Sequence, residues 1–282
     1  MSEPDRLYIV DLSNMYHRAF HAVRPLTTSE GIPVNAVQGT ANMLVSLVRD
    51  RRAARLAVAL DSTTSWRKQK YPYYKANRGP MDDSLSLQVP YIHRLVHAMG
   101  IPMYHEEGYE ADDVVASLVR ATARKSVVVS GDKDFAQLVE PGVVLYDAMK
   151  RVEYDEAAVE ERWGVRPDQM RDYLSLVGDS SDNVPGVSGV GPKTAARLLR
   201  RYGSIPGIMD NLGSLAPKVR GRLERGREAL EQSRELVTMC DSLPLGGAAA
   251  PVLGPVDKRR LARLLDELEI VKLKRRLRLE EA

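Results

Sequence analysis

Short apolar runs alternate with helix-like apolar repeats through the first half of the chain. Three runs are rich in aliphatic residues and predict buried strands, at 7–10, 55–60 and 126–131. Apolar residues three or four positions apart predict helices in three further segments, at 37–48, 92–99 and 114–119. This alternation predicts an α/β fold with a mostly parallel sheet and helices on both faces.

The pattern changes to helical periods alone from about Glu156. A turn-rich stretch at 183–192 precedes an expected helix from Lys193 to Tyr202, and a charged helix is expected to follow through Met239. A stretch rich in Pro, Gly and Ala at 243–255 is typical of a linker, and leucines at helical spacing follow it at 261–268. The change predicts two domains, an α/β domain over 1–165 and an all-α domain over 166–282.

The composition narrows the class of protein. Of 282 residues, 44% are hydrophobic and 28% are charged, which is typical of a soluble globular protein and excludes general disorder. The single cysteine, Cys240, excludes a disulfide framework and a thiolate zinc cluster. No apolar run is long enough to span a bilayer, and the charged N-terminus does not resemble a signal peptide. We therefore expect a cytoplasmic protein without a membrane partner.

The two signs of charge are segregated along the chain, although 41 basic and 38 acidic residues leave a net charge of only +3. Basic residues concentrate in four segments, at 49–55, 67–78, 218–227 and 272–278, whereas acidic residues gather in short signatures directly after apolar runs. Such segregation predicts basic surfaces for a polyanion around an acidic centre. The alternative for any one basic segment is an ordinary solvated helix face.

Nine carboxylates in five short signatures form the first candidate site. They are Asp11, Asp61, Glu110, Asp112, Asp113, Asp132, Asp134, Asp179 and Asp182. Asp11, Asp61 and Asp132 follow predicted strands, and ligands of open α/β sheets bind beyond the carboxyl ends of the strands. The acids at 110–113 open a predicted helix, where the helix dipole favours negative charge. Asp179 and Asp182 are expected to share a helix face.

Such a cluster needs cations to offset its charge. Two carboxylates about 4 Å apart repel by roughly 4 kcal/mol at an effective dielectric constant of 20. Oxygen ligands without histidine or cysteine favour Mg²⁺, or Mn²⁺ as a substitute, over zinc. Two ions about 3.5–4 Å apart can stabilise both the attacking and the leaving oxygen of a phosphodiester. The alternative is that each aspartate only caps the helix after its strand.

A glycine-rich turn and the helix after it, at about 184–200, form the second candidate site. It contains Gly186, Gly189, Gly191, Lys193 and Thr194, and it resembles the helix–hairpin–helix element, which binds a DNA backbone without reading its sequence. The glycines allow a tight hairpin, and the backbone N–H groups at the start of the next helix can bind a phosphate. The glycine order excludes a dinucleotide-binding fingerprint, and Pro192 excludes a Walker loop. An ordinary glycine turn is the alternative.

A basic and aromatic segment at 66–78 forms the third candidate site. It interleaves one tryptophan and three tyrosines with five Lys or Arg side chains. Stacking faces combined with cations suit single-stranded nucleic acid. The segment follows Asp61 directly, so Lys75 or Arg78 could neutralise a scissile phosphate at the acidic centre. A surface loop with buried tyrosines is the alternative.

Together these motifs resemble the 5′ nuclease family, which includes the 5′→3′ exonuclease domain of bacterial DNA polymerase I, phage 5′ exonucleases and flap endonucleases. The signatures GYEADD, GDKD, GDSSDN and PGVSGVGPKTA occur in the family's order over nearly the whole chain. The resemblance implies a PIN-like α/β domain with a helical arch at about 66–90 and an all-α helix–hairpin–helix subdomain. It also implies Mg²⁺-dependent hydrolysis of DNA near 5′ single-strand/duplex junctions, in primer removal or repair.

The resemblance also implies roles for individual residues. Asp11, Asp61, Glu110 and Asp112 match the ligands of a first metal ion, and Asp132, Asp134, Asp179 and Asp182 match those of a second. Asp113 matches a further acid of the bacterial pattern. Arg67, Lys75 and Arg78 match arch residues that contact the substrate phosphate, and Tyr16, His17 and Arg18 fall in a DNA-contacting helix. A potassium ion is expected on the backbone carbonyls of Val187, Ser188 and Val190.

The sequence departs from the family pattern in two places. His17 stands where bacterial relatives usually have a tyrosine, which affects the expected stacking on the terminal base at the junction. No polymerase portion follows residue 282, so we expect a standalone nuclease, with an excised domain as the alternative. We expect a nucleoid-associated monomer that acts on DNA with a 5′ flap or 5′ end, or on an RNA primer on DNA.

Two other functions are compatible with the same motifs. One is a DNA-junction binder with little turnover, for which the hairpin and the arch would suffice but the nine acids would be unexplained. The other is a PIN-type ribonuclease, which would share the acidic centre, although the hairpin suits a duplex backbone.

Overall fold

The computed structural model describes residues 6–122, 125–246 and 251–279. Its centre is a six-stranded sheet with the strand order β3-β2-β1-β4-β5-β6. All neighbouring strands are parallel except β5 and β6, which are antiparallel. The strands are β1 (Leu7–Asp11), β2 (Arg55–Ala59), β3 (Met103–Tyr104), β4 (Ser126–Val129), β5 (Val143–Asp147) and β6 (Val152–Tyr154).

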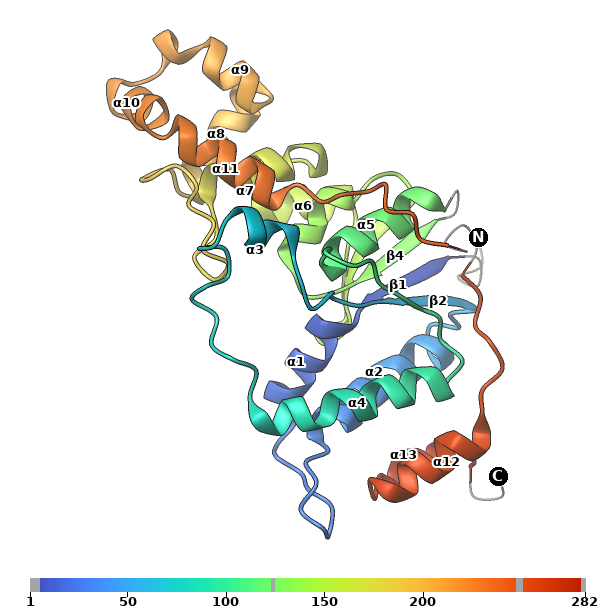
Figure 1. Ribbon diagram of the computed structural model, residues 1–282. Helices are drawn as coiled ribbons and strands as arrows, with labels where there is room; N and C mark the ends of the chain where they lie inside the picture. The colour runs from blue at the N-terminus through green and yellow to red at the C-terminus, as the bar shows by residue number, and fades with distance from the viewer. Residues whose placement is uncertain (1–5, 123–124, 247–250, 280–282) are drawn as a thin grey trace.

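Helices cover both faces of the sheet, as the apolar pattern predicts (Figure 1). Leu7 and Ile9 of β1 belong to one hydrophobic cluster and Tyr8 and Val10 to the other, since successive side chains of a strand point to opposite faces. One face carries α5 (Ala111–Ala121) and the 3₁₀ helix η2 (Lys133–Leu138). The other face carries α1 (Leu12–Ala22), α2 (Asn35–Arg49) and α4 (Asp83–Ala98). The expected helices at 37–48, 92–99 and 114–119 lie within or at the ends of α2, α4 and α5.

A largely helical region follows β6 and extends away from the sheet (Figure 1). It contains α6 (Glu156–Trp163), η3 (Pro167–Gln169), α7 (Met170–Val177), α8 (Pro192–Tyr202), α9 (Ile205–Asp210), η4 (Leu212–Ser214), α10 (Pro217–Arg225) and α11 (Arg227–Val237). The expected helix at Lys193–Tyr202 is confirmed as α8. The single charged helix expected through Met239 is wrong, because Pro217 starts a new helix and Gly226 separates α10 from α11.

The last two helices return to the sheet domain, which differs from the expected division at residue 165. The chain runs from α11 along α5 and reaches α12 (Lys258–Glu267) and α13 (Val271–Arg276) on the far side of the sheet (Figure 1). Leu261 and Leu265 of α12 are buried in the same cluster as α4. Arg94 of α4 forms an ion pair with Glu267 (2.7 Å). The expected linker at 243–255 lies partly outside the described residues.

The arch region at 66–90 contains two helices joined by irregular chain. A short helix, α3 (Trp66–Lys70), is followed by turns over 71–82 and then by the first half of α4. No helix in the described ranges is long and apolar enough to cross a membrane.

Candidate metal and nucleic-acid site

Four carboxylates gather at the carboxyl ends of the central strands, and we call them the acid rim: Asp11, Asp61, Asp112 and Asp132. Asp11 ends β1, Asp61 and Asp132 follow β2 and β4, and Asp112 lies in the first turn of α5. Burial and the charges of Asp61 and Asp132 raise the pKa of Asp11 to about 6. Burial raises the pKa of Asp112 well above its ordinary value, and the other rim acids add to this while Lys75 opposes it. The rim is therefore a site of uncompensated negative charge.

Hydrogen bonds from the starts of helices orient the rim carboxylates. Asp11 caps α1 by accepting a hydrogen bond from the N–H of Asn14, and Asp132 caps η2 by accepting one from the N–H of Asp134, both at 3.0 Å. Asp61 accepts a hydrogen bond from the first N–H of α5 at 2.9 Å. The helix-capping alternative is thus correct for Asp11 and Asp132. Capping fixes the position of these carboxylates and does not conflict with a second role.

A second group of acids is held by a lysine of the chain itself. Lys133 lies between Asp134 and Asp179: its Nζ is 3.3 Å from Asp134 Oδ1 and also donates to Asp179. Burial and the charge of Asp132 raise the pKa of Asp134 to about 7. Burial would raise the pKa of Asp179, but hydrogen bonds from Lys133 and Ser181 outweigh it and lower the pKa to about 2. This group is closer to electrical balance than the rim.

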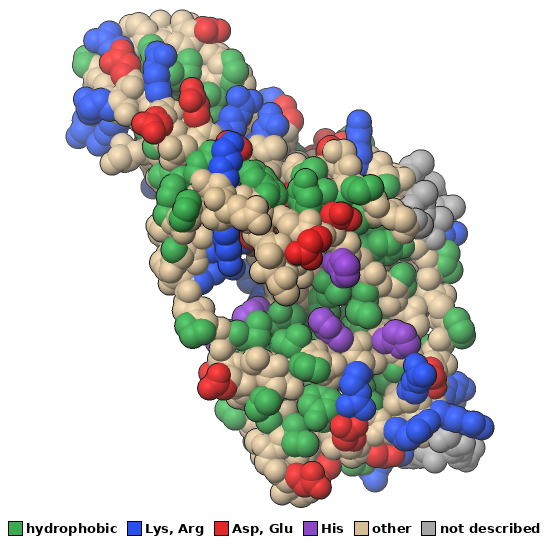
Figure 2. Space-filling model, viewed as in Figure 1, with side chains coloured by type: hydrophobic (Ala, Val, Ile, Leu, Met, Phe, Trp, Pro, Cys, Tyr) green, Lys and Arg blue, Asp and Glu red, His purple; other side chains and the backbone are tan. Residues whose placement is uncertain are grey.

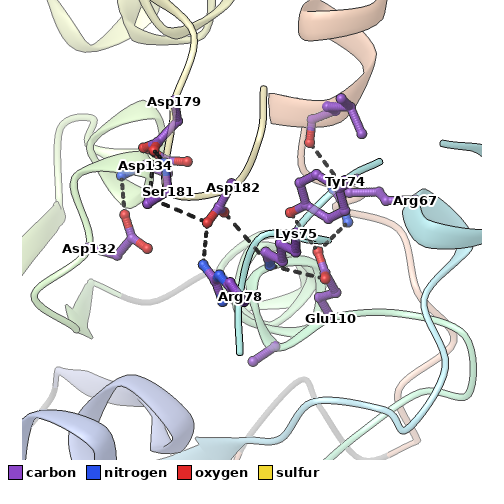
Figure 3. A network of polar contacts seen from close by, with 12 residues as sticks. Arg67, Tyr74, Lys75, Arg78, Glu110, Asp132, Asp134, Asp179, Ser181 and Asp182 are labelled. Carbon is purple, nitrogen blue, oxygen red and sulfur yellow. Dashed lines mark hydrogen bonds and ion pairs between the residues drawn. The ribbon is translucent and has the colours of Figure 1, made fainter. Parts of the chain in front are cut away.

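A third group joins the arch to the remaining acids (Figure 3). Lys75 Nζ lies 3.0 Å from Glu110 and 3.9 Å from Asp182, and Arg78 donates a hydrogen bond to Asp182. The backbone N–H of Lys75 also donates to the carbonyl of Asp182 (2.9 Å). Glu110 accepts a further hydrogen bond from the hydroxyl of Tyr74 (3.1 Å). Lys75 and Arg78 thus point into the acidic centre, as the position of the segment predicts.

The GDSSDN signature is a turn, so the expectation that Asp179 and Asp182 share a helix face is wrong. Helix α7 ends at Val177, and paired backbone hydrogen bonds join Asp179 to Val184 across the turn. Gly178 has a φ of +72°, and a Cβ at this position would lie 2.5 Å from the carbonyl oxygen of Val184. Only glycine fits this close approach, which ends the helix before the two aspartates.

No three acidic, histidine or cysteine side chains of the described residues already form a metal site. The cations Lys75, Arg78 and Lys133 form ion pairs with the outer acids Glu110, Asp182 and Asp179. The donor set itself suits a hard divalent ion because every candidate ligand is a carboxylate oxygen. For the outer acids to bind metal ions, these three side chains would have to leave their carboxylate partners.

Arg67 and Asp113 are structural, which corrects two predicted roles. Arg67 is 2% exposed and Asp113 is fully buried, and the guanidinium donates two hydrogen bonds to the carboxylate (2.6 and 2.8 Å). Arg67 also donates to the carbonyls of Leu236 and Thr238 after α11. The pair therefore ties α3, α5 and the end of α11 together. Burial leaves Arg67 unable to contact a substrate phosphate and Asp113 unable to bind a metal without unfolding this contact.

The helix after β1 places its three predicted DNA-contacting residues differently. Tyr16 is buried, and burial with the charge of Asp61 raises its pKa to about 12. His17 is partly buried with its ring 5.0 Å from that of Tyr16, and burial lowers its pKa. Arg18 forms an ion pair with Asp147 at 3.0 Å. His17 is thus the most available of the three for a nucleic-acid base.

The glycine-rich turn is a compact hairpin before α8. Gly186 and Gly189 have positive φ values of +60° and +79°, and a Cβ on Gly186 would lie 2.6 Å from the backbone of Val177. Helix α8 starts at Pro192 without a side-chain cap, and Gly191 and Lys193 beside it are exposed, while Thr194 is partly buried. An exposed helix start of this kind can bind an anion, and the contact with DNA stays a prediction. Sequence reasoning missed Arg222 of α10, which donates a hydrogen bond to the carbonyl of Gly189 (2.7 Å).

The predicted potassium site lies in the same hairpin. The carbonyl of Val187 accepts a hydrogen bond from the N–H of Val190 (2.8 Å), while Ser188 is exposed between them. The potassium ion stays a prediction.

An opening passes beneath the chain between α3 and α4 (Figures 1 and 2). In the space-filling view Lys and Arg side chains lie along its upper edge, and further basic side chains gather over α10. A single strand could reach the acidic centre through such an opening, and basic side chains would favour its phosphates.

Two models of known protein families together match residues 6–253 of the chain. The model of the 5′-3′ exonuclease N-terminal resolvase-like domain matches residues 6–164, and that of the 5′-3′ exonuclease C-terminal SAM fold matches residues 165–253. A 5′-3′ exonuclease of Aquifex aeolicus is 38% identical over 95% of this chain and 93% of its own length. A DNA polymerase I of Caldicellulosiruptor bescii is also 38% identical over 98% of this chain, which spans only 34% of that relative.

Solved structures support the same fold. The bacteriophage T5 flap endonuclease, in a complex with DNA and metal ions, covers 98% of this chain with a TM-score of 0.71 at 21% identity. The T5 5′-exonuclease with bound zinc covers 94% with a TM-score of 0.70 at 22% identity. The PIN-like and helical architecture expected from the motifs is therefore confirmed.

Proposed function

The chain belongs to the 5′-3′ exonuclease family, and from this premise we propose that it hydrolyses DNA phosphodiesters as a 5′→3′ exonuclease and flap endonuclease. The substrate would be DNA with a 5′ flap or a 5′ end, and an RNA primer on DNA would be accepted. The observation that carries the proposal is the acid rim, where four carboxylates of the described chain face one another with raised pKa values for Asp11 and Asp112. A protein that only bound DNA would gain nothing from this repulsion.

The rim acids are the proposed core of a Mg²⁺ site, with Mn²⁺ as a substitute. Asp11, Asp61, Asp112 and Asp132 would hold the ions, and Glu110, Asp134, Asp179 and Asp182 would join them once the lysines and the arginine between them move. When bound, the ions supply electrostatic stabilisation of the attacking and leaving oxygens of the phosphodiester. Asp113 is not part of this set because Arg67 occupies both of its oxygens.

The basic side chains supply the remaining parts of the site. Lys75 and Arg78 lie beside Glu110 and Asp182, so they can pass from these acids to the scissile phosphate and orient it. The exposed start of α8 is proposed to bind the duplex backbone away from the cut. A potassium ion on the carbonyls of Val187, Ser188 and Val190 would strengthen that contact. The protein is proposed to act as a cytoplasmic monomer at the nucleoid.

A cleavage assay with a defined junction tests the proposal. A duplex with a 5′ flap labelled at its 5′ end is incubated with the protein in Mg²⁺, in EDTA, and with the Asp132→Ala variant. Short labelled products near the junction are expected only for wild-type protein in Mg²⁺. Arg120→Ala is a suitable control, because Arg120 is exposed at the opposite end of α5 from the rim.

The same assay separates the alternative functions. Binding of the flap duplex without products in Mg²⁺ or Mn²⁺ would contradict the nuclease proposal and favour a junction binder. Equal cleavage of single-stranded RNA and flapped DNA would favour a ribonuclease.

A further inference from the structure

A small cavity lies directly beside the acid rim, on the flank that faces away from the arch. Its volume is about 150 Å³. The residues that line it include Asp132, Lys133, Lys150, Tyr154, Arg162 and Trp163. We propose that this cavity binds one nucleotide of the strand whose phosphate lies at the rim. The inference rests on the proposed function and adds a specificity site to it.

Two aromatic rings form the wall of the cavity. Tyr154 at the end of β6 and Trp163 at the end of α6 have ring centroids 5.4 Å apart and ring planes inclined at 47°. Both side chains pack against the core but stay only partly buried. Partly buried aromatic rings at a cavity of this size suit a nucleobase, since every base can stack on an aromatic side chain.

The cavity is lined by three basic side chains, Lys133, Lys150 and Arg162, and by two acids, Asp132 and Asp147, so the balance of charge favours a phosphate. Lys150 and Arg162 are exposed. The acid deepest in this wall, Asp147, is already balanced by Arg18 at 3.0 Å and by Lys150 at 3.6 Å. These hydrogen bonds and charges outweigh burial and lower the pKa of Asp147. A base on the rings with its phosphate on Arg162 or Lys150 therefore combines stacking with a charge-assisted contact.

The position of the cavity fits a strand that crosses the rim. The sheet order places Asp61 and Asp11 on one side of Asp132, and β5 and β6 on the other. The arch lies over the first side, where Lys75 contacts Glu110. On the second side Trp163 is followed by Gly164, whose carbonyl accepts a hydrogen bond from Arg200 of α8 (3.1 Å). The cavity thus lies between the acid rim and the helix that follows the DNA-binding hairpin.

Kinetics with the flap substrate test the proposal first. Trp163→Ala and Arg162→Ala are expected to raise KM about 10-fold and to change kcat less than about twofold. The lost stacking or phosphate contact helps to bind the strand but does not touch the reacting phosphate. Trp163→Phe keeps a stacking face and should stay within about threefold of wild type. Arg120→Ala is the matched control for the loss of an exposed arginine.

Fluorescence tests the contact without cleavage. The chain has two tryptophans, so Trp66→Phe leaves Trp163 as the only indole. In EDTA, flapped DNA is expected to quench this fluorescence. A parallel titration with a nucleoside 5′-monophosphate distinguishes a free nucleotide from one within the strand. Quenching by both ligands supports a site that binds a free nucleotide, and quenching by DNA alone supports a site that binds a nucleotide only as part of the strand.

Two results together would overturn the inference while leaving the nuclease proposal intact. The Trp163 and Arg162 variants would have the same kinetics as Arg120→Ala, and the fluorescence would be unchanged in both titrations. Conversely, clear quenching by DNA with no cleavage by wild-type protein in Mg²⁺ or Mn²⁺ would support the cavity and contradict the nuclease proposal.

Discussion

Asp112 and Asp113 are neighbours in the first turn of α5, yet they lie in opposite electrostatic environments. Asp113 is fully buried against Arg67, which donates to both of its oxygens. Asp112 is also desolvated, and although Lys75 lowers its pKa, burial and the charges of Asp132, Asp11 and Asp61 raise it well above its ordinary value. Successive helix residues point about 100° apart, so one side chain faces the interior and the other faces the rim.

The difference shows which acids stabilise the fold and which acids lower the stability of the folded state. A buried carboxylate with a bidentate arginine is compensated within the chain. The rim acids have repelling neighbours instead, and burial adds to the repulsion. Acids kept in this way are typical of functional sites. The prediction follows that Asp112 matters for activity and Asp113 for stability.

The largest expected effect is on catalysis by Asp112→Asn. The substitution removes one rim charge without changing the size of the side chain, so activity should fall by roughly 10²–10³-fold or more. The free energy of unfolding in EDTA should be unchanged or higher, because one source of repulsion is lost. Flap cleavage in Mg²⁺ and urea unfolding in EDTA measure the two quantities. Near-normal cleavage would remove Asp112 from the site.

Asp113→Asn should act on stability instead. It removes the bidentate anionic partner of the buried Arg67 guanidinium and leaves only the longer contact to Glu110 (3.4 Å), and breaking such a buried pair typically costs about 3–5 kcal/mol. Urea unfolding measures the loss. The double variant Arg67→Met with Asp113→Leu should recover much of it, since apolar side chains of similar size can replace a buried ion pair. An unfolding midpoint equal to that of wild type for Asp113→Asn would contradict the structural role.

The pH dependence of stability extends the comparison to Asp134. Its pKa in the folded state, about 7, is above the ordinary value of 3.8, so the folded state holds the proton more tightly than the unfolded state. The stabilising contribution of the proton on Asp134 to the free energy of unfolding is complete below about pH 4 and is lost as the pH rises to 7. In EDTA, Asp134→Asn should therefore gain about 1–3 kcal/mol over wild type between pH 5 and pH 7.5. A constant difference between the two proteins would contradict the raised pKa.

The smallest expected effect concerns Lys133, which lies where the acids would otherwise gather. Lys133→Met removes a cation that competes for Asp134 and Asp179. The dissociation constant for Mn²⁺ should fall severalfold, which corresponds to about 1 kcal/mol. Calorimetric titration without DNA measures it. Weaker binding would mean that Lys133 supports the metal site.

The elements predicted from sequence are those with a strong local pattern. Strands β1, β2 and β4 are continuous apolar runs, and the start of α5 has acids at a helix N-terminus, where they are favourable. Strands β3 and β6 are only two and three residues long, which is too short for a period to be seen. The return of α12 to α4 depends on long-range packing that no local pattern contains.

The sequence predicts the residues of the site better than it predicts the contacts between them. The nine acids and the basic segment were identified by spacing and resemblance. Spacing could not separate Asp112 from Asp113, because the distinction depends on Arg67, 46 positions away from Asp113 in the sequence. The spacing of Asp179 and Asp182 predicts a shared helix face, whereas the structure has a turn at 178–184. Spacing does not reveal this turn, because the requirement for glycine at 178 comes from the carbonyl of Val184.

Titration of Mn²⁺ into the matched pair Asp112→Asn and Asp113→Asn tests the central claim most directly. Under conditions in which each variant is folded, we expect Asp112→Asn to bind Mn²⁺ at least 10-fold more weakly than wild type, whereas Asp113→Asn binds with wild-type affinity. Equal weakening in both variants, or loss in Asp113→Asn alone, would contradict the division of these neighbouring acids into a metal ligand and a structural partner.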